Sequence, residues 1–180
     1  PASAVPPASS AAVAAAPAAV PGAAGAAGAP PVPEGAAVAR ERVTVSTDVL
    51  RLTFDTEGGS VIESELLKYA DATEPDKHVL LLDTNGHEIY QAQSGLIGGA
   101  FPNHKTPMSF SGDKSLADGA QELVARFESP AVGGVKLVKT YTLKRGSYVI
   151  GVRHEVINQG GQPVRPQLYL QLVRDGNQPS

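Results

Sequence analysis

Apolar and polar residues alternate with a period of two through most of the chain beyond residue 39. Leu50, Leu52 and Phe54, for example, are separated by Arg51 and Thr53. Because successive side chains of a strand point to opposite faces, this alternation predicts half-buried β-strands. We expect strands at 43–45, 50–54, 60–67, 79–82, 89–93, 123–127, 135–144, 148–158 and 164–173.

The segments between these predicted strands are short and rich in turn-forming residues. Gly58-Gly59 separates two strands, and Asn85-Gly86 predicts a hairpin turn because both residues tolerate a positive φ. No window of helical length carries an apolar stripe with a period of 3.6 residues. The pattern therefore predicts an all-β fold, an antiparallel β-sandwich. The segment 164–173 is followed by a polar end, so we expect it to leave an exposed sheet edge.

The last long hairpin allows a register to be predicted. A two-residue turn at 145–146 would pair Tyr141 with Ile150 and Lys136 with Glu155. The odd-numbered residues of the first strand then form an apolar face suited to the core, and Lys136 and Glu155 form a favourable cross-strand pair. A slip of one residue would move every side chain to the wrong face, so this register is a sharp expectation.

Residues 1–39 differ in composition from the rest of the chain. They are almost entirely Ala, Pro, Gly, Val and Ser, and Glu34 is their only charged residue. The longest stretch without Pro or Gly, 8–16, is shorter than the roughly 12–15 residues that a lone helix needs. We therefore expect a disordered Ala/Pro-rich linker over 1–39 that tethers a β domain over 40–180. A low-complexity tail without a partner is the alternative.

Charge and composition exclude several classes of function. The formal net charge is −3, so no basic excess exists to neutralise the phosphates of a nucleic acid. Without cysteine the chain has no disulfide, thiolate metal site or cysteine nucleophile. No apolar run reaches the roughly 20 residues that span a bilayer, and no charged region typical of a signal peptide opens the chain. Because the chain opens with Pro rather than Met, we expect it to be processed, cut or engineered, and the layout of linker and β domain suggests a piece cut from a larger protein.

Glu63 and Glu65 are the candidates for a catalytic pair of carboxylates. They lie two residues apart on one face of a predicted strand, with Cα atoms about 6.5–7 Å apart. A pair with this spacing could act on a sugar. Glutamate on a solvent-facing strand is the ordinary explanation, and we adopt it.

The four histidines, His78, His87, His104 and His154, show no spacing typical of a metal site. We expect the first three to lie in loops, and His87-Glu88 lacks the second histidine of a zinc-binding helix. His154 alternates with predicted core residues. This favours a partly buried, hydrogen-bonded histidine over a metal ligand.

The glycine-rich segment 95–99 is not a phosphate-binding loop, because no helix follows it and Pro102 prevents one. We expect a flexible loop there. Three serines lack the surroundings of a nucleophile elbow: Ser94, Ser109 and Ser111.

Three tyrosines could line a cleft, although core or rim packing is the more common role of such residues: Tyr141, Tyr148 and Tyr169. We therefore assign no catalytic, cofactor-binding or metal-binding residue from the sequence.

Three segments, taken in order, carry a family resemblance. The first is FDTEGG at 54–59, with Val61 and Leu66-Leu67 after it. The second is IYQAQSGL at 89–96, and the third is YTLKRGSY at 141–148, with Val152 and 156–158 behind it. Together with the preceding Ala/Pro-rich linker, these segments resemble the large periplasmic domain of the YidC-type membrane protein insertases of bacteria. The resemblance covers roughly 42–172.

This resemblance implies a β-supersandwich, a fold shared with mutarotase-like proteins, on the periplasmic face of the bacterial inner membrane. Proteins of this family insert and fold inner-membrane proteins, alone or with the Sec translocon. They do so through a hydrophilic groove with a positively charged residue among later transmembrane helices. Those helices are not in this sequence, so no functional residue is carried over.

The resemblance also implies a non-catalytic accessory domain without a cofactor, anchored to the membrane through segments outside this chain. Its expected partners are SecD and SecF of the Sec translocon and nascent membrane proteins. The chain would hold about half of the domain. We therefore expect a truncated sandwich that lacks several strands and is marginally stable or prone to aggregate alone.

Two other functions remain open from the sequence. One is a carbohydrate-binding or mutarotase-like sugar-active domain, which rests on fold analogy alone and needs a carboxylate and a histidine that converge in a cleft. The other is an exported adhesion or scaffold module.

Overall fold

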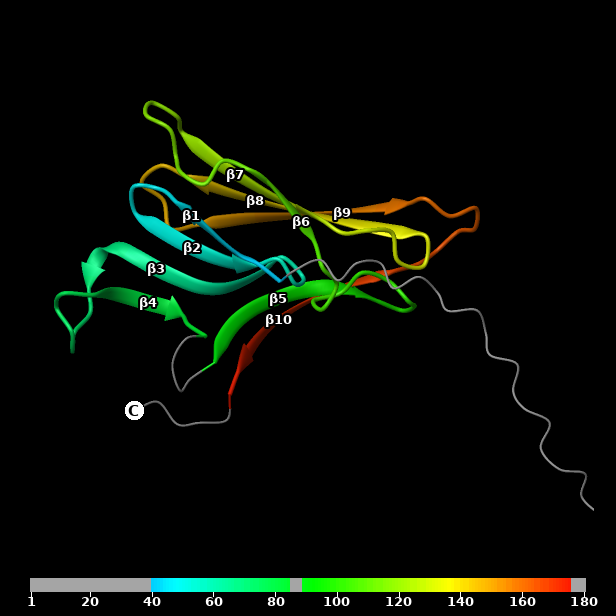
Figure 1. Cartoon of the computed structure of the whole chain (residues 1–180), viewed down its shortest axis with the longest axis horizontal. Coiled ribbons are helices and arrows are strands. Elements are labelled where there is room, and N and C mark those ends of the chain that lie inside the picture. Colours follow the sequence, from blue (N-terminus) through cyan, green and yellow to red (C-terminus); the bar gives the residue numbers. More distant parts are fainter. Residues whose placement is uncertain (1–39, 85–88, 176–180) are drawn as a thin grey trace, which may run out of the picture. The chain divides into compact units, whose positions relative to one another are not determined.

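The computed structural model describes residues 40–84 and 89–175, and this part of the chain consists of strands in two sheets, without a helix (Figure 1). The strands are β1 Arg42–Ser46, β2 Leu50–Asp55, β3 Ser60–Ala70, β4 His78–Leu82, β5 Tyr90–Ile97, β6 Ser109–Gly112, β7 Glu122–Glu128, β8 Val135–Lys144, β9 Ile150–Asn158 and β10 Gln167–Arg174. The pairs between them are antiparallel. The prediction of an all-β, antiparallel sandwich is confirmed.

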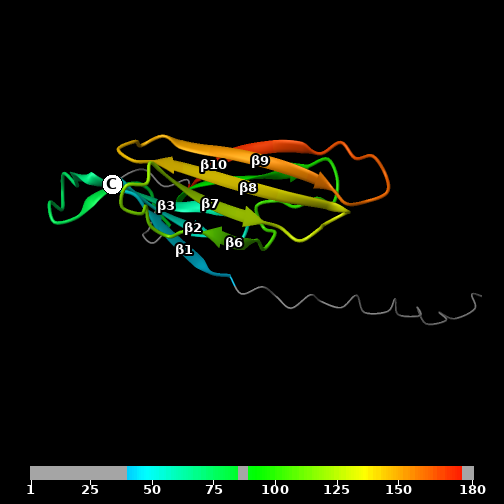
Figure 2. The same cartoon turned by 90° about the horizontal axis from the view of Figure 1, so that it is seen from above.

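The two sheets differ in size. One has six strands in the order β1-β2-β3-β5-β10, with β4 paired to β3, and the other has four in the order β6-β7-β8-β9. Figure 1 shows β7, β8 and β9 as a layer above β3, β5 and β10. Seen from above in Figure 2, the four-stranded sheet overlies the other sheet.

The core lies between the sheets and is centred on aromatic rings from both. The Phe54 ring of β2 lies 5.0 Å from Phe127 of β7 and 4.7 Å from Tyr141 of β8, centroid to centroid. Phe127 also contacts Phe110 of β6 at 5.4 Å. Such tilted pairs contribute about 0.5–1.5 kcal/mol each beyond the burial of their area. The side of each sheet that faces this cluster is called the inner face below, and the opposite side the outer face.

Most predicted strands are confirmed, with three corrections. The segment 95–99 is not a flexible loop throughout, because β5 continues to Ile97 and buries Leu96. His78 begins β4 and so does not lie in a loop. The short strand β6 was not expected from the sequence. The predicted turn at 85–86 lies outside the described residues.

The predicted register of the β8–β9 hairpin is wrong by two residues. Tyr141 pairs with Val152 instead of Ile150, and Glu155 pairs with Val138 instead of Lys136. The connection is longer than two residues because β8 ends at Lys144 and β9 begins at Ile150. A shift of two preserves the alternation of faces. The odd-numbered residues of β8 therefore still point inward, as expected.

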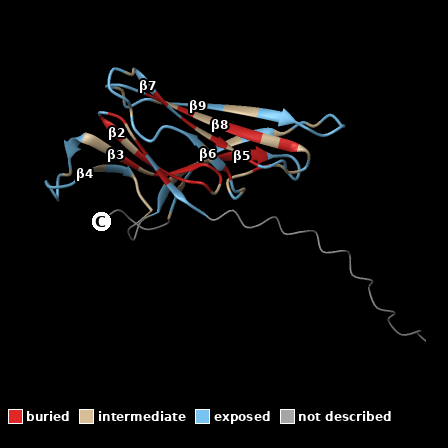
Figure 3. Ribbon diagram, turned by 45° about the horizontal axis from the view of Figure 1, so that its top comes forward, coloured by how far each residue is buried: buried red, intermediate tan, exposed pale blue. Residues whose placement is uncertain are grey.

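One side of the sandwich is open. β10 lies at the end of its sheet and β9 at the end of the other, among the described strands. Across the β5–β10 ladder, Leu170 pairs with Ser94 and therefore shares its inner face, yet Leu170 is 68% exposed while Ser94 is buried. The inward-facing Val152 of β9 is 43% exposed. Figure 3 shows the contrast, with β8 largely buried and β9 beside it largely exposed. The expected exposed edge at the last strand is confirmed.

Candidate functional site

The outer face of the six-stranded sheet carries a polar strip that crosses four strands. Asp55 of β2 pairs with Ser60 of β3, and both alternate with core residues. Gln93 of β5 pairs with Gln171 of β10, and the Gln171 amide donates a hydrogen bond to the Gln93 side-chain oxygen at 2.8 Å. Because cross-strand partners share a face, these side chains form one surface.

The segment after β5 folds back over this polar strip. The turn from Asn103 to Thr106 is closed by the Thr106 N–H, which donates to the Asn103 carbonyl at 3.0 Å, and by the Asn103 N–H, which donates to the Thr106 hydroxyl at 2.9 Å. The turn is fixed to the sheet where the Gly58 N–H donates to the Thr106 carbonyl at 2.8 Å. This bond holds His104 and Lys105 above the outer face.

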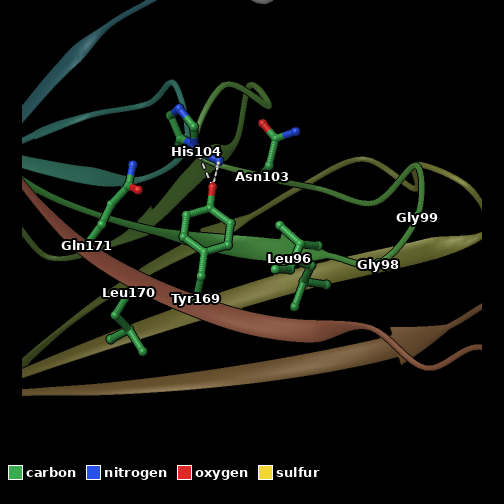
Figure 4. Close-up of a pocket in the computed structure, with 9 residues that line it drawn as sticks. Leu96, Gly98, Gly99, Asn103, His104, Tyr169, Leu170 and Gln171 are labelled. Carbon is green, nitrogen blue, oxygen red and sulfur yellow. Dashed lines mark hydrogen bonds between the residues drawn. The ribbon is translucent and has the colours of Figure 1, made fainter.

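Tyr169 of β10 stands on the outer face and reaches His104 (Figure 4). The tyrosine oxygen lies 2.5 Å from His104 Nδ1 and accepts a hydrogen bond from the His104 N–H at 3.1 Å. Gly95, the partner of Tyr169 on β5, makes room for this arrangement. A Cβ at Gly95 would lie 2.6 Å from the tyrosine oxygen and 2.7 Å from the Cα of Asn103.

Two depressions share His104 as a wall. The larger has a volume of about 550 Å³ and is bounded by Tyr169, Gln171 and the end of β5 (Figure 4). The smaller has a volume of about 130 Å³, and its walls are almost all polar. The residues around it are Arg40, Asp55, Glu57, Ser60, Gln91, Gln93, His104 and Lys105.

Arg40 holds the two carboxylates of the small pocket in place. Its Nε lies 2.5 Å from Asp55 Oδ2, and its Nη1 lies 3.1 Å from Glu57 Oε2. The hydrogen bond to Asp55 raises the pKa of Arg40, so the guanidinium stays charged. The other oxygen of Asp55 accepts the Glu57 N–H at 2.8 Å. The Ser60 hydroxyl, which lies behind this group, is buried and has no hydrogen-bond partner within the described part of the chain.

A second polar group lies between the two sheets. Lys139 of β8 is fully buried, and its Nζ donates to the carbonyls of Gly58 at 2.6 Å and Ser94 at 2.7 Å. The Ser94 hydroxyl lies 2.8 Å from His154 Nε2. Burial lowers the pKa of Lys139 to about 7. Burial, and then the charge of Lys139, also lower the pKa of His154.

The carboxylates singled out in the sequence do not converge on a cleft. Glu65 forms an ion pair with Arg51 Nη1 at 2.6 Å and a hydrogen bond with His78 Nδ1 at 2.7 Å on the outer face. Glu63 accepts a hydrogen bond from the Thr53 hydroxyl at 3.4 Å. Both residues lie on the outer face, as the ordinary explanation expects, but they are not freely exposed, because the Glu65 side chain is only 14% exposed.

The histidines are placed by their hydrogen bonds. His154 is partly buried and bonded to Ser94, as predicted. His104 lies in a loop, as predicted, whereas His87 lies outside the described residues. Within the described ranges, no group of three or more histidine, aspartate or glutamate side chains could hold a metal ion.

The tyrosines divide between core and cleft. Tyr141 is buried, and its hydroxyl donates to the Gly59 carbonyl at 2.7 Å. Tyr148 is exposed and packs on Tyr69 at 5.7 Å between ring centroids. Of the three, Tyr169 alone lines the larger depression.

Two functional candidates were missed in the sequence. Lys139 interrupts an apolar face of β8. A charged residue at an inward position has to be hydrogen-bonded when it is buried, so its place in the pattern could have predicted a buried polar group. The small polar pocket combines Arg40, Asp55, Gln91 and His104 from separate segments. No local sequence motif predicts that these residues come together.

Comparison with known proteins decides the family. The profile of the YidC periplasmic domain matches residues 42–180 of this chain. The chain belongs to the YidC periplasmic domain family. This match covers every strand described above, and the recognition made from the three sequence segments is confirmed.

Relatives of this YidC periplasmic domain are named membrane protein insertase YidC. The protein of Bordetella pertussis is 45% identical over 149 residues, which is 80% of this chain and 26% of that protein. The Bordetella petrii protein is 48% identical over 150 residues, or 81% of this chain and 26% of its own length. The Burkholderia thailandensis protein is 48% identical over 134 residues, which is 74% of this chain and 24% of that protein. The chain thus spans about a quarter of the length of these relatives. No helix within the described ranges is long and apolar enough to cross a membrane.

Proposed function

We propose that this YidC periplasmic domain is a non-catalytic accessory part of an insertase that inserts and folds proteins of the bacterial inner membrane. The domain faces the periplasm, and segments outside this chain anchor it to the membrane. The match of the periplasmic domain family over 42–180 carries the proposal. The names of the curated relatives agree with it.

The chemistry of the described side chains supports an accessory role. His154 is bonded to Ser94, and Glu65 to Arg51 and His78, and neither His154 nor Glu65 lines the two depressions beside His104. These titratable groups therefore stabilise the fold by bonding to one another. A general acid or base instead has to reach a substrate.

We infer that the partners are SecD and SecF of the Sec translocon, together with nascent membrane proteins. The match to the YidC periplasmic domain family supports this inference, and the curated relatives are named membrane protein insertases.

The proposal is tested in the parent protein, whose gene is first sequenced on both sides of this segment. We expect apolar spans of membrane length there. Residues 40–180 are then deleted in frame. We expect insertion of test membrane proteins to continue and copurification of SecD and SecF to be lost. An insertase that is expressed at a normal level but cannot insert would show that the domain is part of the insertion machinery. Unchanged copurification would remove the proposed partners.

A further inference from the structure

We propose that Lys139, Ser94 and His154 form an acid-sensitive latch, which holds the two sheets together while its bases are neutral and lets the sheets part between β9 and β10 when those bases take up protons. These three residues are called the latch below. The inference rests on contacts between the two sheets, so it does not depend on the insertase proposal.

The bonds of the latch all cross from one sheet to the other. Lys139 of β8 donates to the carbonyl of Gly58, in the turn between β2 and β3, and to the carbonyl of Ser94 on β5. His154 of β9 bonds the Ser94 hydroxyl. The sheets can therefore separate at this point only if these three hydrogen bonds break.

The latch has no place for positive charge. Lys139 has two hydrogen-bond acceptors within the described residues, and an ammonium group has three N–H groups. Burial lowers the pKa of Lys139 to about 7. Within the described ranges, Lys139 is the only charge that shifts the pKa of His154, and it lowers that pKa. No carboxylate therefore offsets a charge on either base in this part of the chain.

The other neighbours of Lys139 do not compensate a charge either. Its partner on β7 is the apolar Phe127. Tyr141 of β8 donates its hydroxyl to the Gly59 carbonyl, and burial raises its pKa, so it stays neutral. Lys139 and His154 are direct partners on the β8–β9 ladder. Protonation of both thus places two like charges opposite each other between the sheets, which disfavours the closed form.

The latch lies where the sandwich is easiest to open. β9 and β10 each end their sheet among the described strands. His154 is half-buried, and Val152 on the same face of β9 is 43% exposed. Local opening at such an edge breaks fewer contacts than complete unfolding does. Because opening admits water to both bases, acid shifts the equilibrium toward the open form.

An open latch changes the surface that the domain presents. Ser94 lines a hollow of about 160 Å³ between the sheets, together with apolar side chains that include Val61 of β3, Val152 of β9 and Leu170 of β10. Val61 is only 5% exposed in the closed form. Parting of the sheets widens this hollow. Proton uptake by the latch thereby controls how much apolar surface is open to solvent.

The test measures thiol labelling in the whole 180-residue chain, which contains no cysteine of its own. Val61→Cys places the probe in the hollow. Val45→Cys is the matched control, fully buried on β1 at the side where the Ser46 N–H donates to the Lys114 carbonyl. Protection of each thiol is its labelling rate in the urea-unfolded variant divided by its rate in the folded variant, at the same pH.

We expect the thiol of Val61→Cys to be less protected than that of Val45→Cys and to lose at least about ten-fold in protection from pH 8 to pH 6. Linkage assigns about ten-fold of this change to Lys139 and at most about four-fold to His154. Equal protection of the two thiols would show that only complete unfolding exposes the hollow. Protection that does not change with pH would show that opening leaves the latch closed. Either result would overturn the proposal.

Variants of the latch assign the effect to its residues. In the Val61→Cys chain, Lys139→Met should reduce the loss of protection between pH 8 and pH 6 to at most about four-fold. His154→Gln, at a half-buried position that tolerates change, should reduce the loss by up to about four-fold and can still bond the Ser94 hydroxyl. His78→Gln on the outer face is the matched histidine control and should leave the loss unchanged. An undiminished loss in both latch variants would assign the pH response to other groups, and the proposal would fall.

Discussion

Lys139 lies directly opposite His154 on the β8–β9 ladder, and both side chains reach Ser94 on the other sheet. The lysine donates to the Ser94 carbonyl, and the histidine bonds the Ser94 hydroxyl. The two acceptors of Lys139 are main-chain carbonyls. A neutral amine has two N–H groups, enough for both of them. The burial of this amine therefore couples the packing of the two sheets to pH.

The free energy of unfolding should rise between pH 7 and pH 9. The folded pKa of Lys139 is about 7, below its ordinary value of 10.5. The unfolded chain therefore binds more protons in this window, and stability increases with pH there, by about 2–3 kcal/mol in all. His154, whose pKa is lowered from 6.5, adds a rise of the same sign only below that value. Urea unfolding at pH 7, 8 and 9 measures the slope.

The variant Lys139→Met should lose this slope, because it removes the group that titrates. Lys136→Met is the matched control on the same strand. Lys136 forms an ion pair with Glu128 and is partly exposed, so Lys136→Met should keep the rise of unfolding free energy with pH. A slope that persists in Lys139→Met would assign the pH dependence to another group.

Tyr141→Phe should lower the free energy of unfolding by about 1–2 kcal/mol. The change removes the hydroxyl that donates to the Gly59 carbonyl at 2.7 Å. The ring contacts with Phe54 and Phe127 are kept, so the loss reports the hydrogen bond alone. Tyr90→Phe, at an exposed position, should change stability by less than about 0.5 kcal/mol. Equal effects of the two changes in chemical denaturation would refute this explanation.

Gly58→Ala should destabilise the domain more than Gly146→Ala. Both glycines have a positive φ, 76° and 68°. A Cβ at Gly58 would lie 2.2 Å from the His104 carbonyl oxygen, whereas a Cβ at Gly146 meets no atom within 4 Å. We expect about 1–2 kcal/mol for the backbone strain at Gly146 and at least about 1 kcal/mol more at Gly58, where the overlap adds to it. Thermal unfolding of the two variants ranks them, and a larger loss at Gly146 would contradict the close approach.

The β8–β9 hairpin shows where sequence reasoning succeeds and where it stops. Alternation placed Lys139 and Tyr141 on the inner face, which the structure confirms. The exact register failed because contacts from distant segments shape the turn. The Asp48 carboxylate accepts the Gly146 N–H at 2.9 Å, and Tyr148 leaves the ladder to pack on Tyr69. Neither contact has a local signal in the sequence.

Gly95 shows the same limit at the candidate site. The sequence predicts a strand that ends at residue 93 and a flexible loop from Gly95, yet Gly95 lies within β5 and marks a close approach of other groups. The Tyr169 hydroxyl and the Asn103 backbone occupy the space that a side chain would need. The strands themselves could be predicted from periodicity. The pocket could not, because it depends on how the segment after β5 folds back over them.

Leu170→Lys tests whether the open side of the sandwich contributes less to the stability of this chain than the closed core does. In this chain the change should alter the free energy of unfolding by less than about 0.5 kcal/mol, because the side chain is 68% exposed. It should also reduce association, since a charge on an exposed edge strand opposes pairing with another chain. Leu52→Ala, at a fully buried position, should instead cost about 2–5 kcal/mol.

The same change should cost about as much as a core substitution in a longer piece of the parent protein, because we expect additional strands there to cover the inner face of β10. Urea unfolding and sedimentation velocity of both lengths provide the comparison. If Leu170→Lys is tolerated equally in the short and the long protein, the inner face of β10 stays open to solvent. The exposed leucines would then belong to a binding surface, and the expectation of missing strands would be wrong.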